Sequence, residues 1–264
     1  MRKIILASIL LAASFGTDAH ASSFMFDDIQ DRDPAVEEDS WSASAEFGFL
    51  MRSGNTETQS WKTKLDLSRD AGMWRHKGMI DYYRQERETD TGDTAIDADR
   101  LFISLQSNRM FKSSERSSLF VYTSYEDDAL NSFDYQATIA AGYGARYSFH
   151  EKLYADFEVG PGMSYNKFAT TGETESDAIL RMATNVNWTI SENSKFTQLI
   201  STEIGEDNTR SRAVSSLTAN LNSRLAMRLS LTLTHNSTVA MQGDGSFPEK
   251  LDTETAVTLV YTFQ

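Results

Sequence analysis

Hydrophobic and polar residues alternate for seventeen residues in the segment from Phe133 to Phe149. Its odd-numbered positions carry aromatic and aliphatic side chains, whereas its even-numbered positions carry mostly polar or small ones. A period of two is typical of a β-strand with one apolar and one polar face. The segment is longer than the about 5–6 residues of an ordinary strand. Its aromatic residues gather toward its two ends, which is typical of a strand that crosses a bilayer between two aromatic girdles.

The same alternation recurs along the chain and predicts about twelve strands. The segments expected to form them are Ser40–Arg52, Thr58–Ser68, Trp74–Gln85, Ala98–Asn108, Ser117–Glu126, Ser132–Phe149, Leu153–Phe168, Asp177–Ile190, Lys195–Gly205, Ser211–Asn222, Arg228–Asn236 and Asp252–Phe263. The fifth and ninth segments carry aromatic or aliphatic residues on both faces, so their orientation stays open.

The lengths of the connections predict how these strands are arranged. Connections after even-numbered segments are short, as at 150–152, and several after odd-numbered segments are long and acidic, as at 86–97 and 237–251. Barrels of the outer membrane have short periplasmic turns and longer extracellular loops. We therefore predict an all-β fold, a transmembrane antiparallel up-and-down β-barrel, with both termini in the periplasm.

The last segment carries an apolar face that ends in aromatic residues, made by Val257, Leu259, Tyr261 and Phe263. A phenylalanine at the end of such a strand resembles the signal that the bacterial barrel-assembly machinery reads. Gln264 follows that phenylalanine and departs from the pattern. The segment predicts the assembly machinery as a partner during biogenesis.

The N-terminus predicts export from the cytoplasm. A short positive stretch precedes the apolar segment Ile4–Phe15, and Ala19–Ala21 supplies small residues at the cleavage-determining positions. We expect residues 1–21 to be a secretory signal peptide, residues 22–39 to be an acidic, flexible periplasmic leader, and residues 40–264 to be the barrel. The chain has no cysteine, which excludes a lipoprotein anchor, disulfides and thiolate metal sites. The predicted location is the outer membrane of a Gram-negative cell.

The charge of the chain limits its partners. The formal net charge is −13, which argues against nucleic acid because that ligand calls for basic patches. Many acidic residues fall between the predicted strands and are expected to solvate surface loops. A looser hypothesis is that these loops share divalent cations with lipopolysaccharide phosphates. We expect outer-membrane lipid and lipopolysaccharide as partners and no cofactor; the oligomeric state stays open.

Several short elements resemble a known family by their order and spacing. They are Gly54–Thr56, Tyr125–Asp127, Gly160–Gly162 and Leu259–Phe263. The chain from about Ser40 to its end resembles the YdiY-like domain of unknown function, whose members are described as salt-induced outer membrane proteins. The resemblance implies a barrel with a link to salt or osmotic stress. It implies no established substrate and no catalytic residues.

Catalysis by the barrel would need a positioned nucleophile and base. The histidines outside the predicted signal peptide are His76, His150 and His235. The segment from His235 to Ser237 holds a histidine and a serine at a strand end, where a lipid-acting barrel could keep them. A triad needs hydrogen-bond reach between its members, and no motif fixes that geometry. We predict that the protein is not an enzyme.

Charged residues occupy the face opposite the apolar stripe and are candidates for lining the lumen. They are Glu46, Lys62, Lys64, Asp66, Lys77, Asp81, Arg100, Asp134, Arg146, Asp156, Glu158, Arg181, Arg212 and Glu254. Eight strands enclose a space that side chains just fill, and sixteen to eighteen leave an aqueous channel. About twelve strands lie between these limits. Side chains of both signs could pair across the interior and leave a narrow path or none.

The sequence therefore favours a non-enzymatic barrel that contributes to envelope integrity or to salt or osmotic adaptation, with a narrow and weakly selective pore. An uptake channel for a small solute is the first alternative. A barrel enzyme acting on lipid or peptide is a second. A third is a soluble periplasmic barrel or sandwich, in which the two faces of every strand would be inverted.

Overall fold

Alternating segments of the chain form twelve β-strands in the computed structural model, which describes residues 40–52, 58–89, 93–111, 114–128, 133–169, 171–239, 247 and 249–263. The predicted signal peptide (1–21) and leader (22–39) lie outside the described residues. The strands are β1 (Ser40–Arg52), β2 (Thr58–Ala71), β3 (Trp74–Glu88), β4 (Thr94–Phe111), β5 (Ser114–Asp128), β6 (Phe133–His150), β7 (Leu153–Phe168), β8 (Thr174–Ser191), β9 (Ser194–Ile204), β10 (Thr209–Asn220), β11 (Leu225–Asn236) and β12 (Leu251–Phe263). The described part of the chain contains no helix that is long and apolar enough to cross a membrane.

Each strand pairs in antiparallel fashion with its neighbours in sequence, and β1 pairs with β12 to close the barrel. The prediction of an all-β, up-and-down barrel of about twelve strands is therefore confirmed. Short turns such as 72–73 and 192–193 lie at one end, called here the short-turn end. Longer connections such as 169–173 and 237–250 lie at the other, the long-loop end.

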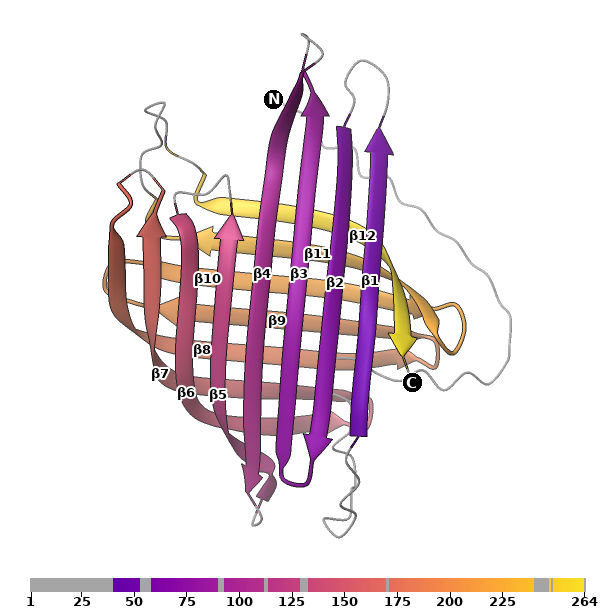
Figure 1. Cartoon of the computed structure of the whole chain (residues 1–264). Helices are drawn as coiled ribbons and strands as arrows, with labels where there is room; N and C mark the ends of the chain where they lie inside the picture. Colours follow the sequence, from indigo (N-terminus) through magenta and orange to yellow (C-terminus); the bar gives the residue numbers. More distant parts are fainter. Residues whose placement is uncertain are drawn as a thin grey trace.

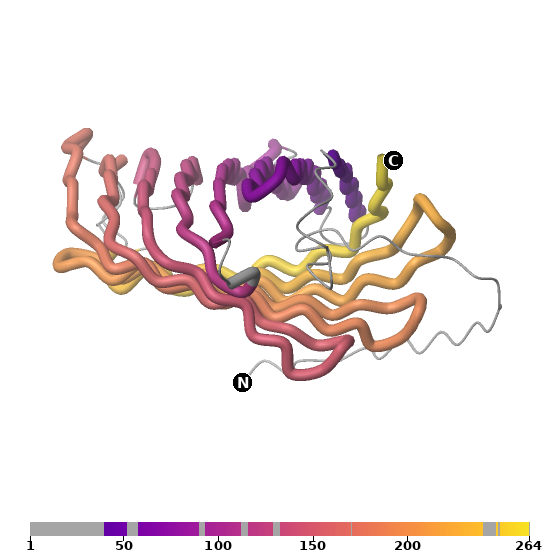
Figure 2. Tube along the Cα trace, turned by 90° about the horizontal axis from the view of Figure 1, so that it is seen from below, coloured from indigo at the N-terminus to yellow at the C-terminus, as the bar shows by residue number. Residues whose placement is uncertain are grey.

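The barrel is flattened, so that its two walls cross each other. In Figure 1 the strands β1–β4 run vertically in front of β9–β12, which run across the view. Figure 2 shows β1–β4 nearly end-on above β9–β12 seen lengthwise. The closing pair β1–β12 joins these walls at a corner and spans only five residue pairs, from Ala43–Phe263 to Phe47–Leu259. Beyond it, a Cβ on Gly48 would lie 2.7 Å from the carbonyl oxygen of Val257, so glycine permits this crossing.

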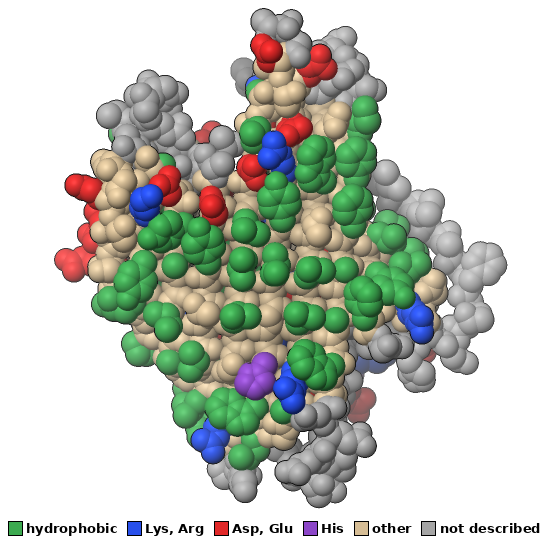
Figure 3. Space-filling view, in the orientation of Figure 1, with side chains coloured by type: hydrophobic (Ala, Val, Ile, Leu, Met, Phe, Trp, Pro, Cys, Tyr) green, Lys and Arg blue, Asp and Glu red, His purple; other side chains and the backbone are tan. Residues whose placement is uncertain are grey.

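The outer surface carries the apolar residues that a water-soluble barrel would bury. Large side chains such as Ile139, Leu105 and Leu229 are about half exposed, and green side chains cover the middle of the face in Figure 3. Aromatic residues bound this belt on both sides. Exposed examples are Trp41, Trp74, Tyr147, Phe149, Trp188 and Phe263 toward the short-turn end and Phe49, Tyr125 and Tyr165 toward the long-loop end. An apolar belt between two aromatic girdles is the outer surface of a bilayer-spanning barrel.

The alternation predicted to run unbroken from Phe133 is interrupted at its start. The register of β6 against β7 shifts between Phe133 and Tyr135, as in a β-bulge, and an extra residue of this kind reverses the faces on one side of it. Phe133 is consequently buried and packs on Phe168, with ring centroids 4.9 Å apart. Asp134 is exposed and pairs with Lys167 at 2.8 Å. The prediction that Asp134 lines the lumen is therefore wrong.

Candidate functional site

The inner surface of the barrel is polar and charged, because every second residue of each strand points inward. Apart from Asp134, the predicted lumen residues lie on this inner surface, and the acids and bases among them are mostly buried. Buried charges are tolerated only when they are paired and hydrogen-bonded. The arrangement of these pairs therefore decides whether a path crosses the lumen.

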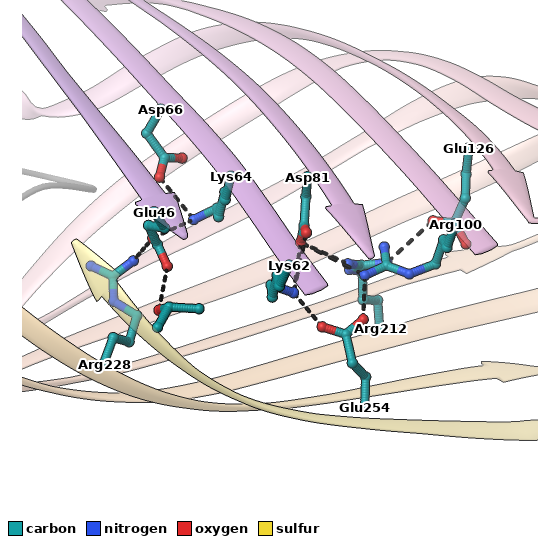
Figure 4. A network of polar contacts seen from close by, with 11 residues as sticks. Glu46, Lys62, Lys64, Asp66, Asp81, Arg100, Glu126, Arg212, Arg228 and Glu254 are labelled. Carbon is teal, nitrogen blue, oxygen red and sulfur yellow. Dashed lines mark hydrogen bonds and ion pairs between the residues drawn. The ribbon is translucent and has the colours of Figure 1, made fainter. Parts of the chain in front are cut away.

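One group of charged residues meets across the lumen in its long-loop half and is called here the ionic belt. Its members are Lys62, Asp81, Arg100, Glu126, Arg210, Arg212 and Glu254. Figure 4 shows most of them meeting from both walls of the barrel. Arg100 contacts Glu254 at 2.5 Å, and Lys62 pairs with both Glu254 and, at 3.1 Å, Asp81. These contacts tie β2, β3 and β4 to β12.

Arg212 connects the ionic belt across the full width of the lumen. It extends from β10, and its Nη1 donates to an oxygen of Glu126 on β5 at 3.2 Å. Its guanidinium also lies 4.5 Å from the ring centroid of Phe102 on β4. Arg210 reaches the same Glu126 at 2.5 Å. One buried carboxylate thus holds two arginines of the opposite wall.

A second group lies near the β1–β12 corner, where Glu46 is the shared acceptor. Glu46 pairs with Arg228 of β11, with Lys64 of β2 at 3.6 Å, and accepts a hydrogen bond from Thr258 at 3.1 Å. Lys64 also contacts Asp66 at 2.9 Å. Figure 4 shows this group beside the ionic belt. Its ion pairs join the strands at the corner from the inside. They add to the backbone pairing of β1 with β12, which spans only five residue pairs.

A third group links β4, β5, β7 and β8. Arg181 contacts Glu158 at 3.2 Å and lies 3.8 Å from the ring centroid of Tyr122. Glu158 also accepts a hydrogen bond from Gln106 at 2.6 Å. A cation over an aromatic face is attracted by the ring quadrupole, more strongly when both are buried. The group lies on the inner surface, on the short-turn side of the ionic belt.

A cavity of about 540 Å³ occupies the short-turn half of the lumen. Its described lining begins at Ser40, Asp70 and Glu192 near the short turns and reaches Asp81 and Arg212 of the ionic belt. Nine cationic and seven acidic side chains face it, along with many serine and threonine hydroxyls. Within the described residues the lumen is thus a polar cavity that ends at the belt. Its volume lies within the range of about 300–1,000 Å³ typical of small-molecule sites.

Several residues of the site were missed by the sequence prediction. Glu126, Arg210, Arg228, Glu203 and Arg75 were not among the residues predicted to line the lumen. All but Glu126 line the cavity, and Glu126 is 3 % exposed within the belt. The signal that identifies them is position: each has the inward parity of its own strand. Only Arg210 lies outside the predicted bounds of its strand; the other four lie inside them, so the alternation already contained the signal.

The histidine and serine considered for catalysis lie at the end of β11, where the structure gives the serine other partners. His235 is exposed on the outer surface, whereas the next residue, Asn236, is 2 % exposed and faces inward. The Ser237 hydroxyl donates to Asn208 at 3.1 Å and accepts from the N–H of Thr209 at 2.8 Å. Among the described residues, no group of three or more acidic, histidine or cysteine side chains could hold a metal ion.

Comparison with known sequences identifies relatives over nearly the whole chain. A family model described as "Protein of unknown function, DUF481" matches residues 45–263. The uncharacterized protein YdiY of Escherichia coli (strain K12) is 26% identical over 266 residues, covering 98% of this chain and 98% of its own. Both matches span the strands that supply the ionic belt.

Comparison with solved structures identifies barrels. The NanC porin is similar with a TM-score of 0.51 at 10% sequence identity, covering 84% of this chain and 100% of the porin chain. An outer membrane channel from Pseudomonas putida F1 has a TM-score of 0.48 at 9% identity, covering 88% of this chain and 100% of its own. The likeness to the NanC porin shows the fold. With the apolar belt and its girdles, the chain is an outer-membrane barrel.

Proposed function

The chain belongs to the DUF481 family of proteins of unknown function, and on that premise we propose that it is a non-enzymatic barrel that contributes to envelope integrity. In this proposal the barrel fills its membrane site without leaving a general pore open. The resemblance to salt-induced proteins extends the proposal to salt or osmotic adaptation.

The ionic belt is the observation that carries this proposal. In this proposal a hydrated ion passes only if Glu126 releases Arg210 and Arg212, or Glu254 releases Arg100 and Lys62. Leaving one member of a buried ion pair uncompensated costs about 3–5 kcal/mol. Such a cost keeps the closed arrangement dominant, and any path through it is narrow and seldom open.

The cavity supports a second candidate function, uptake of a small polar solute. A solute that entered at the short turns would meet hydroxyl groups and charges of both signs. The ionic belt would then be the gate that the solute must open. This function differs from the first in one respect: it requires conduction by the unmodified barrel.

Planar-bilayer conductance separates the two functions. The unmodified protein, with folding verified by its heat-dependent gel shift, is expected to show no regular conductance steps. The variant Glu126→Ser/Arg212→Ser removes both partners of the pair that crosses from β5 to β10. It is expected to show discrete steps, because an aqueous path replaces the belt. In cells, it is expected to increase entry of small polar antibiotics and to slow growth at raised salt.

The matched control is Arg146→Ser/Asp156→Ser. This pair is also inside the barrel, with an Nε–Oδ1 distance of 2.6 Å, but it joins the neighbouring strands β6 and β7 along one wall. Its loss should leave the protein silent. Regular steps from the unmodified protein would contradict the closed lumen and favour the uptake channel.

The connection lengths support an orientation with the short turns and both termini in the periplasm. The chain has no cysteine, so single cysteines report the side of a residue cleanly. In intact cells, a membrane-impermeant maleimide is expected to label Glu173→Cys, in an exposed part of the 169–173 connection. It should label Glu151→Cys, in the exposed turn before β7, only after the outer membrane is opened. The reverse pattern would invert the orientation.

This orientation places the acidic connections beside lipopolysaccharide. Glu173 and Glu175 are exposed at the long-loop end, where shared divalent cations could bridge them to lipopolysaccharide phosphates. Assembly into that membrane would use the barrel-assembly machinery, in accordance with the aromatic end of β12.

A further inference from the structure

Aromatic and cationic side chains form a continuous row on the outer surface at the short-turn end. Trp41 of β1 lies opposite Arg69 of β2, which lies opposite His76 of β3, which lies opposite Ser107 of β4. The guanidinium of Arg69 is 5.3 Å from the ring centroid of Trp41. The row therefore brings a cation to the edge of the apolar belt rather than into the lumen.

A second arginine and tryptophan repeat this arrangement two strands away. Arg109 of β4 lies opposite Trp74 of β3, with its guanidinium 5.7 Å from the ring centroid. Trp74 also stacks on His76, with ring centroids 5.9 Å apart, and Ser107 hydrogen-bonds His76 at 2.8 Å. Arg109, Trp74 and His76 are exposed. Stacking on an aromatic face leaves the planar N–H edge of a guanidinium directed at its surroundings.

The surface next to this row is built for acyl chains. On the same strands, one step toward the middle of the barrel, Leu67 is 51% exposed and Leu105 is 57% exposed. A lipid whose chains cover these residues would bring its headgroup to the level of Arg69 and Arg109. Tryptophan is the residue that favours this boundary between hydrocarbon and headgroup.

Cations at the long-loop end of the barrel are arranged differently. Arg84 contacts Glu86 at 2.6 Å and Asp99 at 3.0 Å, and Lys167 contacts Asp134 at 2.8 Å. Acidic side chains of the protein therefore neutralise those cations. Arg109 at the short-turn end lies over an indole ring instead. The long-loop end therefore carries cations paired with acidic side chains, and the short-turn end carries a cation stacked on an aromatic ring.

We propose that Trp41, Arg69, Trp74, His76 and Arg109 bind the phosphate of an anionic phospholipid in the leaflet at the short-turn end. The charge of the row complements a phosphate diester, and guanidinium groups bind phosphate through paired N–H donors. The indoles hold the cations at headgroup depth, while Leu67 and Leu105 contact the chains. The site lies outside the lumen and needs no conduction; the assignment of its lipid to the periplasmic leaflet rests on the proposed orientation.

Native mass spectrometry of the detergent-purified protein, titrated with dioleoyl phosphatidylglycerol, tests the site. Each cation near a membrane surface contributes about 1 kcal/mol to attraction of an anionic lipid, so removing two corresponds to about thirtyfold. The variant Arg69→Ala/Arg109→Ala is expected to weaken binding by about that factor. Arg69→Lys/Arg109→Lys keeps the charge but loses the planar donors. Its affinity for phosphatidylglycerol is expected to lie between those of the unmodified protein and the alanine variant. A heat-dependent gel shift verifies folding of each variant.

The matched control is Arg84→Ala/Lys167→Ala, which removes two cations at the long-loop end and should leave phosphatidylglycerol binding unchanged. Equal binding by the unmodified protein and Arg69→Ala/Arg109→Ala would overturn the site. A stronger, equally arginine-dependent binding of lipopolysaccharide would also overturn it, because this row would then face the outer leaflet. If free inorganic phosphate competed at the same concentration as the lipid, the site would bind anions in general, and its assignment to a phospholipid would be overturned. Cysteine labelling and conductance report on the orientation and on the closed lumen separately.

Discussion

Ile139→Arg is expected to prevent assembly of the barrel. Ile139 is 50% exposed on the outer surface of β6, between Tyr135 and Tyr143, which places it near the middle of the apolar belt. An arginine on the lipid face at the midplane of a bilayer costs about 2–4 kcal/mol. The variant should be depleted from the outer-membrane fraction and should lose the heat-dependent gel shift of the folded barrel.

Thr197→Arg provides the matched control on the inner face. Thr197 lines the polar cavity on β9, so an added arginine does not face lipid. This variant should reach the outer membrane and retain its gel shift. If the two variants assembled equally well, the outer surface would not face lipid, and the soluble barrel with inverted faces would be favoured.

Glu126→Ala is expected to destabilise the folded barrel more than the loss of an acid that pairs with only one base. Glu126 is 3 % exposed and is shared by Arg210 at 2.5 Å and Arg212 at 3.2 Å. Its removal leaves two buried arginines without that counter-charge, and breaking one buried pair in this way costs about 3–5 kcal/mol. Urea unfolding in lipid vesicles, followed by tryptophan fluorescence, measures the change in the free energy of unfolding.

The control for this loss of a carboxylate is Asp134→Ala. Asp134 pairs with a single base, Lys167, and both side chains are substantially exposed; exposed pairs contribute little. Its unfolding midpoint should match that of the unmodified protein. An equally small change for Glu126→Ala would show that water reaches the belt, and the lumen would not be closed there.

The alternation of residues was enough to predict the strands, because a strand that separates lipid from a polar interior must change chemistry at every residue. The first and seventh strands have the predicted bounds, Ser40–Arg52 and Leu153–Phe168. The ambiguous fifth segment shows where the pattern fails. Phe120 and Tyr122 point inward although they are aromatic, because Arg181 from β8 lies over both rings. A partner three strands away cannot be recognised from the segment itself.

The sequence by itself determined the barrel, its approximate strand number and the inward position of most charged residues, because these follow from a local period of two. Only the tertiary structure decided which charges meet. Arg212 reaches Glu126 and Phe102 on the opposite wall because the barrel is flattened, and flattening depends on the tilt and stagger of all strands together. The bulge before Tyr135 likewise moved Asp134 outward through pairing with β7. The pairing of charges across the lumen is therefore a property of the assembled walls, since no single strand contains both partners of these pairs.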